Sequence, residues 1–353
     1  MLTLNGQKYS RNELQQQCDR YSQQNDWQGD IFRFIAEWID EGNDSIRVQT
    51  SGSTGTPKSI LLKKEHLIQS AIRTQNYLGL RAEDNALLCL PARYIAGKMM
   101  IVRAFVTGYN LITVAPSANP FSQPLQRIDF TAITPHQLWE SYEKLRQMNI
   151  RNIIVGGAEI PPSLEAKTRN IPSAVFATYG MTETGSHVAL RRINGTEAST
   201  IYEALPDVSF DVDTQNRLII RADYLTYSPL QTNDVVELLD HKHFRWLGRY
   251  DNVINSGGIK IFPEEVERII APVIPFVFFI GSLPHEKFSE MVCLFIERAT
   301  PLTEDEQQDI IQRIRPLLSP HKLPRKTICL PHFEYTTTGK LLRKETCRKA
   351  IIH

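Results

Sequence analysis

The chain has 353 residues, and its 40 lysines and arginines almost balance its 39 aspartates and glutamates, so the net charge at pH 7 is only +1. With 42% hydrophobic and 22% charged residues, the composition is that of a soluble globular protein of about two domains. This charge balance excludes a nucleic-acid scaffold, and no apolar stretch resembles a membrane span or a secretory signal. We therefore expect a cytoplasmic protein that binds neither nucleic acid nor membrane.

Cysteine spacing argues against a disulfide framework or a zinc site. The five cysteines are odd in number, and no two of them are closer than 18 positions. A C-x-x-C pair is the usual sign of a zinc site, and it is absent from the sequence. We expect reduced thiols that are mostly buried.

Short apolar runs alternate with amphipathic stretches between about residue 30 and residue 194. The expected strands are 87–90, 111–114, 130–133, 152–155 and 174–178, and the expected helices are 98–106, 135–147 and 161–170. This alternation predicts a mostly parallel sheet with helices on its faces.

The pattern changes after residue 198, where short alternating strands predict an antiparallel sheet or a small barrel. These strands are expected at 208–212, 217–221, 235–239 and 243–246. Beyond residue 249 we expect a helix from Pro263, strands at about 273–280 and 291–296, and a helix at 304–317. The predicted fold is therefore α/β plus α+β, with a large N-terminal domain at 1–250 and a small C-terminal domain at 251–353.

The segment 50–58, with the sequence TSGSTGTPK, combines hydroxyls, glycines and a lysine between two expected strands. Glycines let backbone N–H groups approach an anion, hydroxyls donate further hydrogen bonds, and the lysine adds positive charge. It differs from the G-x-x-x-x-G-K-[ST] nucleotide loop because Pro57 replaces the second glycine. A hairpin tip is the alternative for such a cluster, but the ordered hydroxyls and terminal Lys58 favour a triphosphate site.

This loop resembles the phosphate-binding signature of the acyl-adenylate-forming superfamily, [ST]-S-G-[ST]-T-G-x-P-K. Further segments resemble motifs of the same superfamily in the same order: Gly156-Gly157-Ala158, Tyr179-Gly180-Met181-Thr182-Glu183-Thr184, Gln231-Thr232-Asn233-Asp234, the stretch 248–254, and Thr338-Gly339-Lys340. The resemblance thus extends from Thr50 to Lys340 and implies an enzyme that activates a carboxylate with ATP.

The resemblance also implies roles for individual residues. The phosphates would be held by Thr50, Ser51, Gly52, Ser53, Thr54, Gly55 and Lys58, and adenine by Gly156, Gly157, Ala158, Tyr179, Gly180 and Met181. Asp234 and Arg249 would hold the ribose, and Thr182 would contact the α-phosphate. Glu183 would ligate Mg²⁺, a hard cation that prefers oxygen ligands. Lys340 would be the catalytic lysine that stabilises the charge of the transition state.

In this superfamily the small domain rotates between adenylation and transfer to coenzyme A, which acts as the co-substrate. Asp251 matches the hinge position, and Gly257 and Gly258 match the loop that faces the thiol. Glycines there allow a thin pantetheine arm to approach closely.

The phosphate loop begins at Thr50, which is early for the superfamily, so much of the usual first subdomain is missing. This short form and the segments 90–98 and 183–188 resemble the 2-succinylbenzoate–CoA ligases of menaquinone biosynthesis. Their substrate has a second carboxylate, which needs a cationic partner. Arg93, Lys98 and Arg103 are the candidates.

The acid pocket is further expected to include Tyr94, Ser186 and His187. Tyr94 replaces the histidine of the superfamily's L-P-x-x-H, so the pocket is expected to be shaped differently. His187 lacks a nucleophile elbow, which favours a pocket wall over a catalytic base. Asn233 replaces the glycine of T-G-D, and asparagine tolerates positive φ best among the other residues.

Two alternatives remain open at this point. Another aryl or acyl acid–CoA ligase, or an adenylation domain that loads a carrier protein, would share these motifs. A non-catalytic nucleotide-binding module is the second alternative, which retention of Glu183 and Lys340 disfavours. Apolar surface left by the short first subdomain leads us to expect a homodimer.

Overall fold

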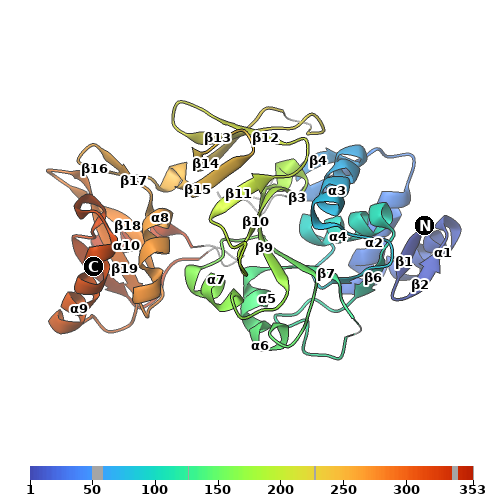
Figure 1. The fold of residues 1–353 in the computed structure, drawn as a ribbon, viewed down its shortest axis with the longest axis horizontal. Coiled ribbons are helices and arrows are strands. Elements are labelled where there is room, and N and C mark those ends of the chain that lie inside the picture. Colours follow the sequence, from blue (N-terminus) through green and yellow to red (C-terminus); the bar gives the residue numbers. More distant parts are fainter. Residues whose placement is uncertain (50–58, 126, 226–227, 336–340, 353) are drawn as a thin grey trace.

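The computed structural model describes residues 1–49, 59–125, 127–225, 228–335 and 341–352. Figure 1 shows the N-terminal helices at one end of the long axis and the C-terminal elements, in orange to red, at the other. The strands form a large 13-stranded sheet, a 5-stranded sheet and a separate two-stranded pair.

The large sheet contains both parallel and antiparallel strands in the order β12-β13-β14-β15-β11-β10-β9-β8-β7-β5-β6-β1-β2. In chain order its strands are β1 (Leu2–Leu4), β2 (Gln7–Tyr9), β5 (Asn85–Leu88), β6 (Asn110–Thr113), β7 (Phe130–Ile133), β8 (Asn152–Val155), β9 (Ala174–Gly180), β10 (His187–Arg192), β11 (Ile201–Ala204), β12 (Ser209–Val212), β13 (Arg217–Arg221), β14 (Leu230–Leu238) and β15 (His243–Arg249). The run from β1 through β6, β5, β7 and β8 to β9 is parallel, and every pair from β9 to β12 is antiparallel.

Helices cover both faces of the parallel strands. One face packs on α1 (Arg11–Tyr21), α2 (Trp27–Ile39), α3 (Lys64–Leu78) and α4 (Ile95–Thr107), and the other on α5 (Pro135–Glu140), α6 (Tyr142–Leu145) and α7 (Pro162–Thr168). On β5, Leu88 belongs to the first core and Leu87 to the second, as the alternation of side chains in a strand requires. All four residues of β7 and all four of β8 are buried because both faces are covered.

The C-terminal part has a core of its own. Its strands are β16 (Ile254–Ser256), β17 (Ile259–Ile261), β18 (Phe278–His285), β19 (Ser289–Glu297) and β20 (Lys326–Leu330), and its helices are α8 (Pro263–Ile270), α9 (Glu304–Ile314) and α10 (Arg343–Ile352). The two-stranded pair is β3 (Ser45–Gln49) with β4 (Ser59–Lys63). Short 3₁₀ turns lie at Thr182–Thr184, Tyr250–Asn252, Ala271–Val273, Arg315–Leu317 and Pro320–Lys322.

The structure confirms the predicted fold class, and β7 and β8 have the expected bounds. The antiparallel strands continue the large sheet and close no barrel within the described residues. The helix expected at 135–147 is two helices, because Ser141 leaves helical geometry and its hydroxyl donates to the Asn119 side chain over 3.2 Å. The strand expected at 273–280 begins only at Phe278, after a 3₁₀ turn.

All five cysteines are free thiols, and Cys18, Cys89 and Cys293 are buried, as the spacing predicted. Among the described helices, none combines the length and the apolar character that crossing a bilayer requires.

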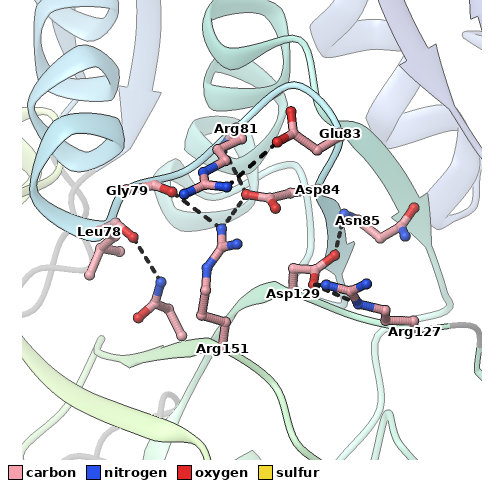
Figure 2. A network of polar contacts seen from close by, with 10 residues as sticks. Leu78, Gly79, Arg81, Glu83, Asp84, Asn85, Arg127, Asp129 and Arg151 are labelled. Atoms are coloured by element: carbon pink, nitrogen blue, oxygen red, sulfur yellow. Dashed lines mark hydrogen bonds and ion pairs between the residues drawn. The ribbon is translucent and has the colours of Figure 1, made fainter.

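A polar network ties together the amino ends of β5, β7 and β8 (Figure 2). Asp84 and Asp129 each precede one of these strands, and both are almost fully buried. Asp84 pairs with Arg151 and accepts the backbone N–H of Arg81 over 2.7 Å. Asp129 accepts the backbone N–H of Asn85 over 3.0 Å, which links β7 to β5. Each buried carboxylate is therefore compensated by hydrogen bonds or an ion pair, as buried charge requires.

We predict that Asp84→Ala lowers the free energy of unfolding by about 2–3 kcal/mol, because it leaves the Arg151 charge and a backbone donor without their partner. Urea unfolding monitored by circular dichroism measures this loss. The adjacent Glu83→Ala is the matched control, since the Glu83 carboxylate is exposed and 3.8 Å from Arg81, and it should cost less than about 0.5 kcal/mol. Equal losses in the two variants would contradict a stabilising role for the network.

Candidate active site

A cavity of about 970 Å³ lies at the carboxyl ends of β7, β8 and β9. Its wall is continued by α4, by β11, β14 and β15, and by Arg268 of α8, which lies beside β15 (Figure 1). Open α/β sheets bind their ligands at this edge. The predicted site residues that line the cavity are Gly156, Gly157, Ala158, Tyr179, Gly180, Met181, Thr182, Glu183, Asp234, Arg249, Arg103, Ser186 and His187.

The turn after β8 requires glycine for two different reasons. A Cβ on Gly156 would lie 2.2 Å from the Thr178 hydroxyl, and Gly157 has a φ of +88°. The first position excludes a side chain through contact with β9, and the second favours glycine through its backbone angle. The turn therefore exposes backbone at the cavity wall, as a surface for a flat ring requires.

The turn between β9 and β10 places Thr182 and Glu183 at the cavity. A Cβ on Gly180 would lie 2.4 Å from the Ser186 carbonyl oxygen, so this close approach of the two strands requires glycine. Thr184 closes the turn, because its hydroxyl donates to the Met181 carbonyl over 2.8 Å and accepts the Met181 N–H over 3.0 Å.

Glu183 has the chemistry of a magnesium ligand. Its partly exposed carboxylate lines the cavity and makes no hydrogen bond or ion pair with other residues of the described part of the chain. Mg²⁺ is commonly held by one or two carboxylates together with substrate phosphates and water. A free carboxylate fits that role, and the described residues contain no cluster of three or more metal-ligating side chains that would hold an ion by protein alone.

The buried Asp234 carboxylate on β14 is held by donors from β15, the adjacent strand, and from β9, which lies further along the sheet. Tyr179 donates its hydroxyl to Oδ2 over 2.8 Å, and Trp246 donates its indole N–H to Oδ1 over 3.0 Å. The Arg249 guanidinium lies 3.5 Å from Oδ1. Burial and the charge of Asp234 raise the pKa of Tyr179 well above its ordinary value, so its hydroxyl remains a donor.

Arg103 is a buried cation that has no anionic partner within the described part of the chain. Its side chain is 2% exposed and reaches the cavity from α4, where it donates to the Ser186 hydroxyl over 2.7 Å. Nε has no hydrogen-bond acceptor, and no carboxylate pairs with the guanidinium among the described residues. Burial lowers the pKa of Arg103 to about 10, which still leaves it charged at neutral pH.

A chain of hydrogen bonds continues from Arg103 into the core. The Ser186 hydroxyl lies 3.3 Å from His187 Nδ1, and His187 Nε2 lies 3.1 Å from the Thr74 hydroxyl. Since the Thr74 hydroxyl donates to the Ser70 carbonyl, we assign the proton of the neutral imidazole to Nε2 and the acceptor role to Nδ1. Burial and the nearby Arg103 charge lower the pKa of His187 well below its ordinary value, so the ring stays neutral.

Three residues that were expected in the acid pocket do not line the cavity. Lys98 lies 3.3 Å from the Glu37 carboxylate and 4.8 Å from the centre of the Phe34 ring. Arg93 stacks on the exposed Tyr94 ring, which immediately precedes α4. Lys98 and Arg103 are five positions apart and so point about 140° apart around the helix, which is why only one of them faces the cavity.

The expected hinge and coenzyme A residues lie outside the cavity wall. The Asp251 carboxylate accepts the side-chain N–H of Asn233 over 2.8 Å, so the residue that replaces glycine in T-G-D contacts the hinge position. Gly257 and Gly258, with φ of +60° and +84°, form the turn between β16 and β17. Gly257 donates its N–H to the Phe288 carbonyl over 2.8 Å.

The phosphate-loop residues at 50–58 and the catalytic-lysine segment at 336–340 lie outside the described residues. The elements that flank them are described. β3 and β4 pair in antiparallel register up to Gln49 and Ser59, and Tyr335 bridges to Leu341.

Sequence reasoning did not single out Trp246 or Thr74. Trp246 reaches Asp234 from the adjacent strand β15, where the register shifts between Val235 and Val236 and Asp234 pairs with Arg249. Such a bulge has no clear signature in the sequence. Thr74 meets His187 across 113 positions of the chain, a separation that no local pattern reports.

We predict that stability falls below about pH 6.5 in part through His187, because the unfolded chain takes up a proton there while the folded imidazole does not. The free energy of unfolding lost through His187 is up to about 1.4 kcal/mol for each pH unit below that value. The loss stops growing only when the pH reaches the lowered pKa of His187 in the folded protein. Urea unfolding between pH 7.5 and pH 5 should therefore show a shallower loss for His187→Gln than for the wild type. His332→Gln, at a side chain that is 90% exposed, is the control and should keep the wild-type slope; the same slope in all three proteins would disprove this account.

Comparisons with known proteins show which sequences and solved structures this chain resembles. A curated 2-succinylbenzoate–CoA ligase from Bacillus mycoides (strain KBAB4) is 24% identical over 349 residues, which cover 88% of this chain and 71% of the relative. The solved o-succinylbenzoate CoA synthetase (MenE) from Bacillus subtilis, in complex with the acyl-adenylate intermediate OSB-AMP, has a TM-score of 0.72 at 20% identity. That match covers 85% of this chain and 68% of the other.

A solved structure similar over nearly the whole chain is an acyl-CoA synthetase (AMP-forming)/AMP-acid ligase II-like protein from Dyadobacter fermentans. It is 33% identical, with a TM-score of 0.63, and the match covers 97% of this chain and 99% of the other. Residues 6–218 match the family described as AMP-binding enzyme. The chain therefore belongs to the AMP-binding enzyme family, the acyl-adenylate-forming ligases.

Proposed function

We propose that this protein joins 2-succinylbenzoate to coenzyme A in two steps that consume ATP. In the first, one carboxylate oxygen of the acid attacks the α-phosphorus of ATP, and pyrophosphate leaves. In the second, the thiolate of coenzyme A attacks the acyl carbon, AMP leaves, and the thiol proton passes to solvent. The observation that carries the choice of acid is the buried guanidinium of Arg103 at the cavity wall, which pairs with no carboxylate among the described residues.

A buried charge without a partner costs several kcal/mol, and a buried cation is normally paired with an anion. Arg103 has only a hydroxyl and a thioether as described hydrogen-bond acceptors. A substrate carboxylate at the cavity wall would supply the missing charge. An acid with a single carboxylate would present its only anionic group to the nucleotide and leave Arg103 unpaired, which favours a dicarboxylic substrate.

Ser186 and His187 support this assignment. Because His187 Nδ1 accepts the Ser186 proton, the Ser186 hydroxyl oxygen faces Arg103 as an acceptor. The neutral imidazole adds no second charge, and so it does not compete with Arg103 for the substrate anion. We assign these three residues to the binding of the acid. In this proposal Arg93, Tyr94 and Lys98 make no contact with it.

The nucleotide would occupy the other half of the cavity. Its adenine would lie along 156–158 and the Tyr179 ring, and its ribose hydroxyls would donate to Asp234 beside Arg249. Thr182 would contact the α-phosphate, and the loop residues Thr50 to Gly55 with Lys58 would hold the outer phosphates. Mg²⁺, held by Glu183, would neutralise phosphate charge. Lys340 would stabilise the transition state between the carboxylate and the α-phosphate.

The second step would use the C-terminal part. We propose that residues 1–250 and 251–353 act as two domains, and that the chain turns at Asp251 between the steps. The rotation would withdraw Lys340 and bring the turn at Gly257 and Gly258 to the acyl-adenylate. Two adjacent glycines leave room there for the thin arm of coenzyme A.

We predict that pyrophosphate is released when purified protein is supplied with ATP, Mg²⁺ and 2-succinylbenzoate, and that coenzyme A then yields the thioester detected by mass spectrometry. 4-Oxo-4-phenylbutanoate, an analogue with a single carboxylate, should be a poor substrate. Arg103→Gln should lower kcat/KM for the diacid by about 100-fold or more and abolish the preference for it, because the second carboxylate loses a buried partner.

Lys98→Gln is the matched control for this assay, since Lys98 lies on the same helix and outside the cavity. It should keep the wild-type KM for the acid. Turnover of benzoates or amino acids in place of the diacid would assign another substrate, and ATP binding without pyrophosphate release from any acid would indicate a non-catalytic module.

We further predict that Lys340→Ala slows adenylation by about 100-fold or more while the protein keeps its melting temperature, because the lysine acts on charge that develops in the transition state. Pyrophosphate release under saturating ATP measures the effect. Lys344→Ala, at an exposed position on α10, should leave the rate unchanged. A near-normal rate in a folded Lys340→Ala protein would remove the lysine from the mechanism.

A further inference from the structure

Asp234 receives a hydrogen bond on each of its carboxylate oxygens from the protein itself. The Tyr179 hydroxyl donates to Oδ2 over 2.8 Å, and the Trp246 indole N–H donates to Oδ1 over 3.0 Å. The Asp234 side chain is only 8% exposed, yet the residue lines the cavity together with both of its donors. The carboxylate is therefore fixed in one orientation at the cavity wall.

Each carboxylate oxygen has about two lone-pair directions, so one hydrogen bond to each leaves a further acceptor site on both. Two adjacent hydroxyls, such as those of a ribose, could donate to both oxygens at once only if the carboxylate is held at the correct angle. The Trp246 indole has a donor and no acceptor, and it carries no charge. It therefore orients the carboxylate and leaves its negative charge intact.

Trp246 is itself held from the C-terminal side. Arg268 of α8 donates to the Trp246 carbonyl over 3.3 Å, and its guanidinium lies 5.7 Å from the centre of the indole ring. Arg268 therefore holds the backbone of Trp246 and lies over its ring, while the indole N–H is held by Asp234. A ring that served only to fill space would not require its N–H to be aimed at a carboxylate.

We propose that Trp246 is a positioning residue for the nucleotide. Its indole N–H orients Asp234 to accept both hydroxyls of a ribose, and so favours a nucleotide that has both hydroxyls over one that lacks the 3′-hydroxyl. This inference rests on the proposed function in one respect, the assignment of Asp234 to the ribose. It extends that assignment to Trp246, whose proposed effect on the nucleotide passes through Asp234.

The test is nucleotide binding by calorimetry in the absence of any acid, with ATP and 3′-deoxyATP as probes. Trp246→Phe keeps an aromatic ring and removes the donor. We expect it to weaken ATP binding by about tenfold, the effect of losing one hydrogen bond to a charged group. Binding of 3′-deoxyATP should change by less than about threefold, since that analogue cannot use both oxygens of Asp234.

Two further variants separate positioning from packing. Trp246→His keeps a ring N–H and should recover part of the preference for ATP, which also tests the proposal if the Phe variant folds poorly. In an Asp234→Ala background, Trp246→Phe should have less than about a twofold effect, because its only route to the nucleotide is gone. Trp139→Phe, at a partly exposed tryptophan on α5, is the control and should bind both nucleotides like the wild type.

Equal weakening of ATP and 3′-deoxyATP by Trp246→Phe, or no change in either, would overturn the proposal. Failure of the ribose assignment would look different: Asp234→Ala would then leave the preference for ATP over 3′-deoxyATP intact. A wild-type protein that bound neither nucleotide would contradict the proposed function itself. The assay uses no acid, so an error in the choice of acid would leave these outcomes unaffected.

Discussion

The site depends on the way in which β9 pairs with its two neighbours. On one side β9 runs parallel to β8, and on the other it runs antiparallel to β10. The chain must therefore leave β9 at the carboxyl edge, turn at once, and return at the same edge. Within this turn the fold concentrates Thr182, Glu183 and Ser186, while the antiparallel strands beyond it bring Asp234 to the same cavity. Gly180 permits this geometry because any side chain there would collide with the returning strand.

The two ends of the parallel strands differ in whether buried charges have partners of opposite charge. At the amino ends, Asp84 and Asp129 are both compensated by arginines and by backbone N–H groups. At the carboxyl ends, Arg103 is equally buried and lacks a carboxylate among the described residues. The first arrangement stabilises the fold, whereas the second costs stability. Under the proposed function, the second carboxylate of the substrate would offset that cost, a trade-off that is common at functional sites.

Prediction from the sequence succeeded where local pattern decides the structure and failed where distant contacts decide it. The continuous apolar runs of β7 and β8 were located correctly because strands covered on both faces leave an unbroken signal. The motif residues after β8 and β9 were brought together as expected, since parallel strands end at one edge. Lys98 and Arg103 could not be separated from sequence, because both lie in an apolar helix whose orientation is set by packing. The interruption at Ser141 depends on Asn119, which lies outside its helix.

Asn233 links the large sheet to the start of the C-terminal part of the chain. Its amide contacts Asp251 through one hydrogen bond, and the Asp251 side chain is 53% exposed. Such a bond contributes about 1 kcal/mol, only about twice the thermal energy. It would shift a two-state equilibrium about fivefold. In the proposed rotation about Asp251, a contact of this strength would favour one arrangement of the C-terminal part over the others, and ordinary thermal motion would still be able to break it.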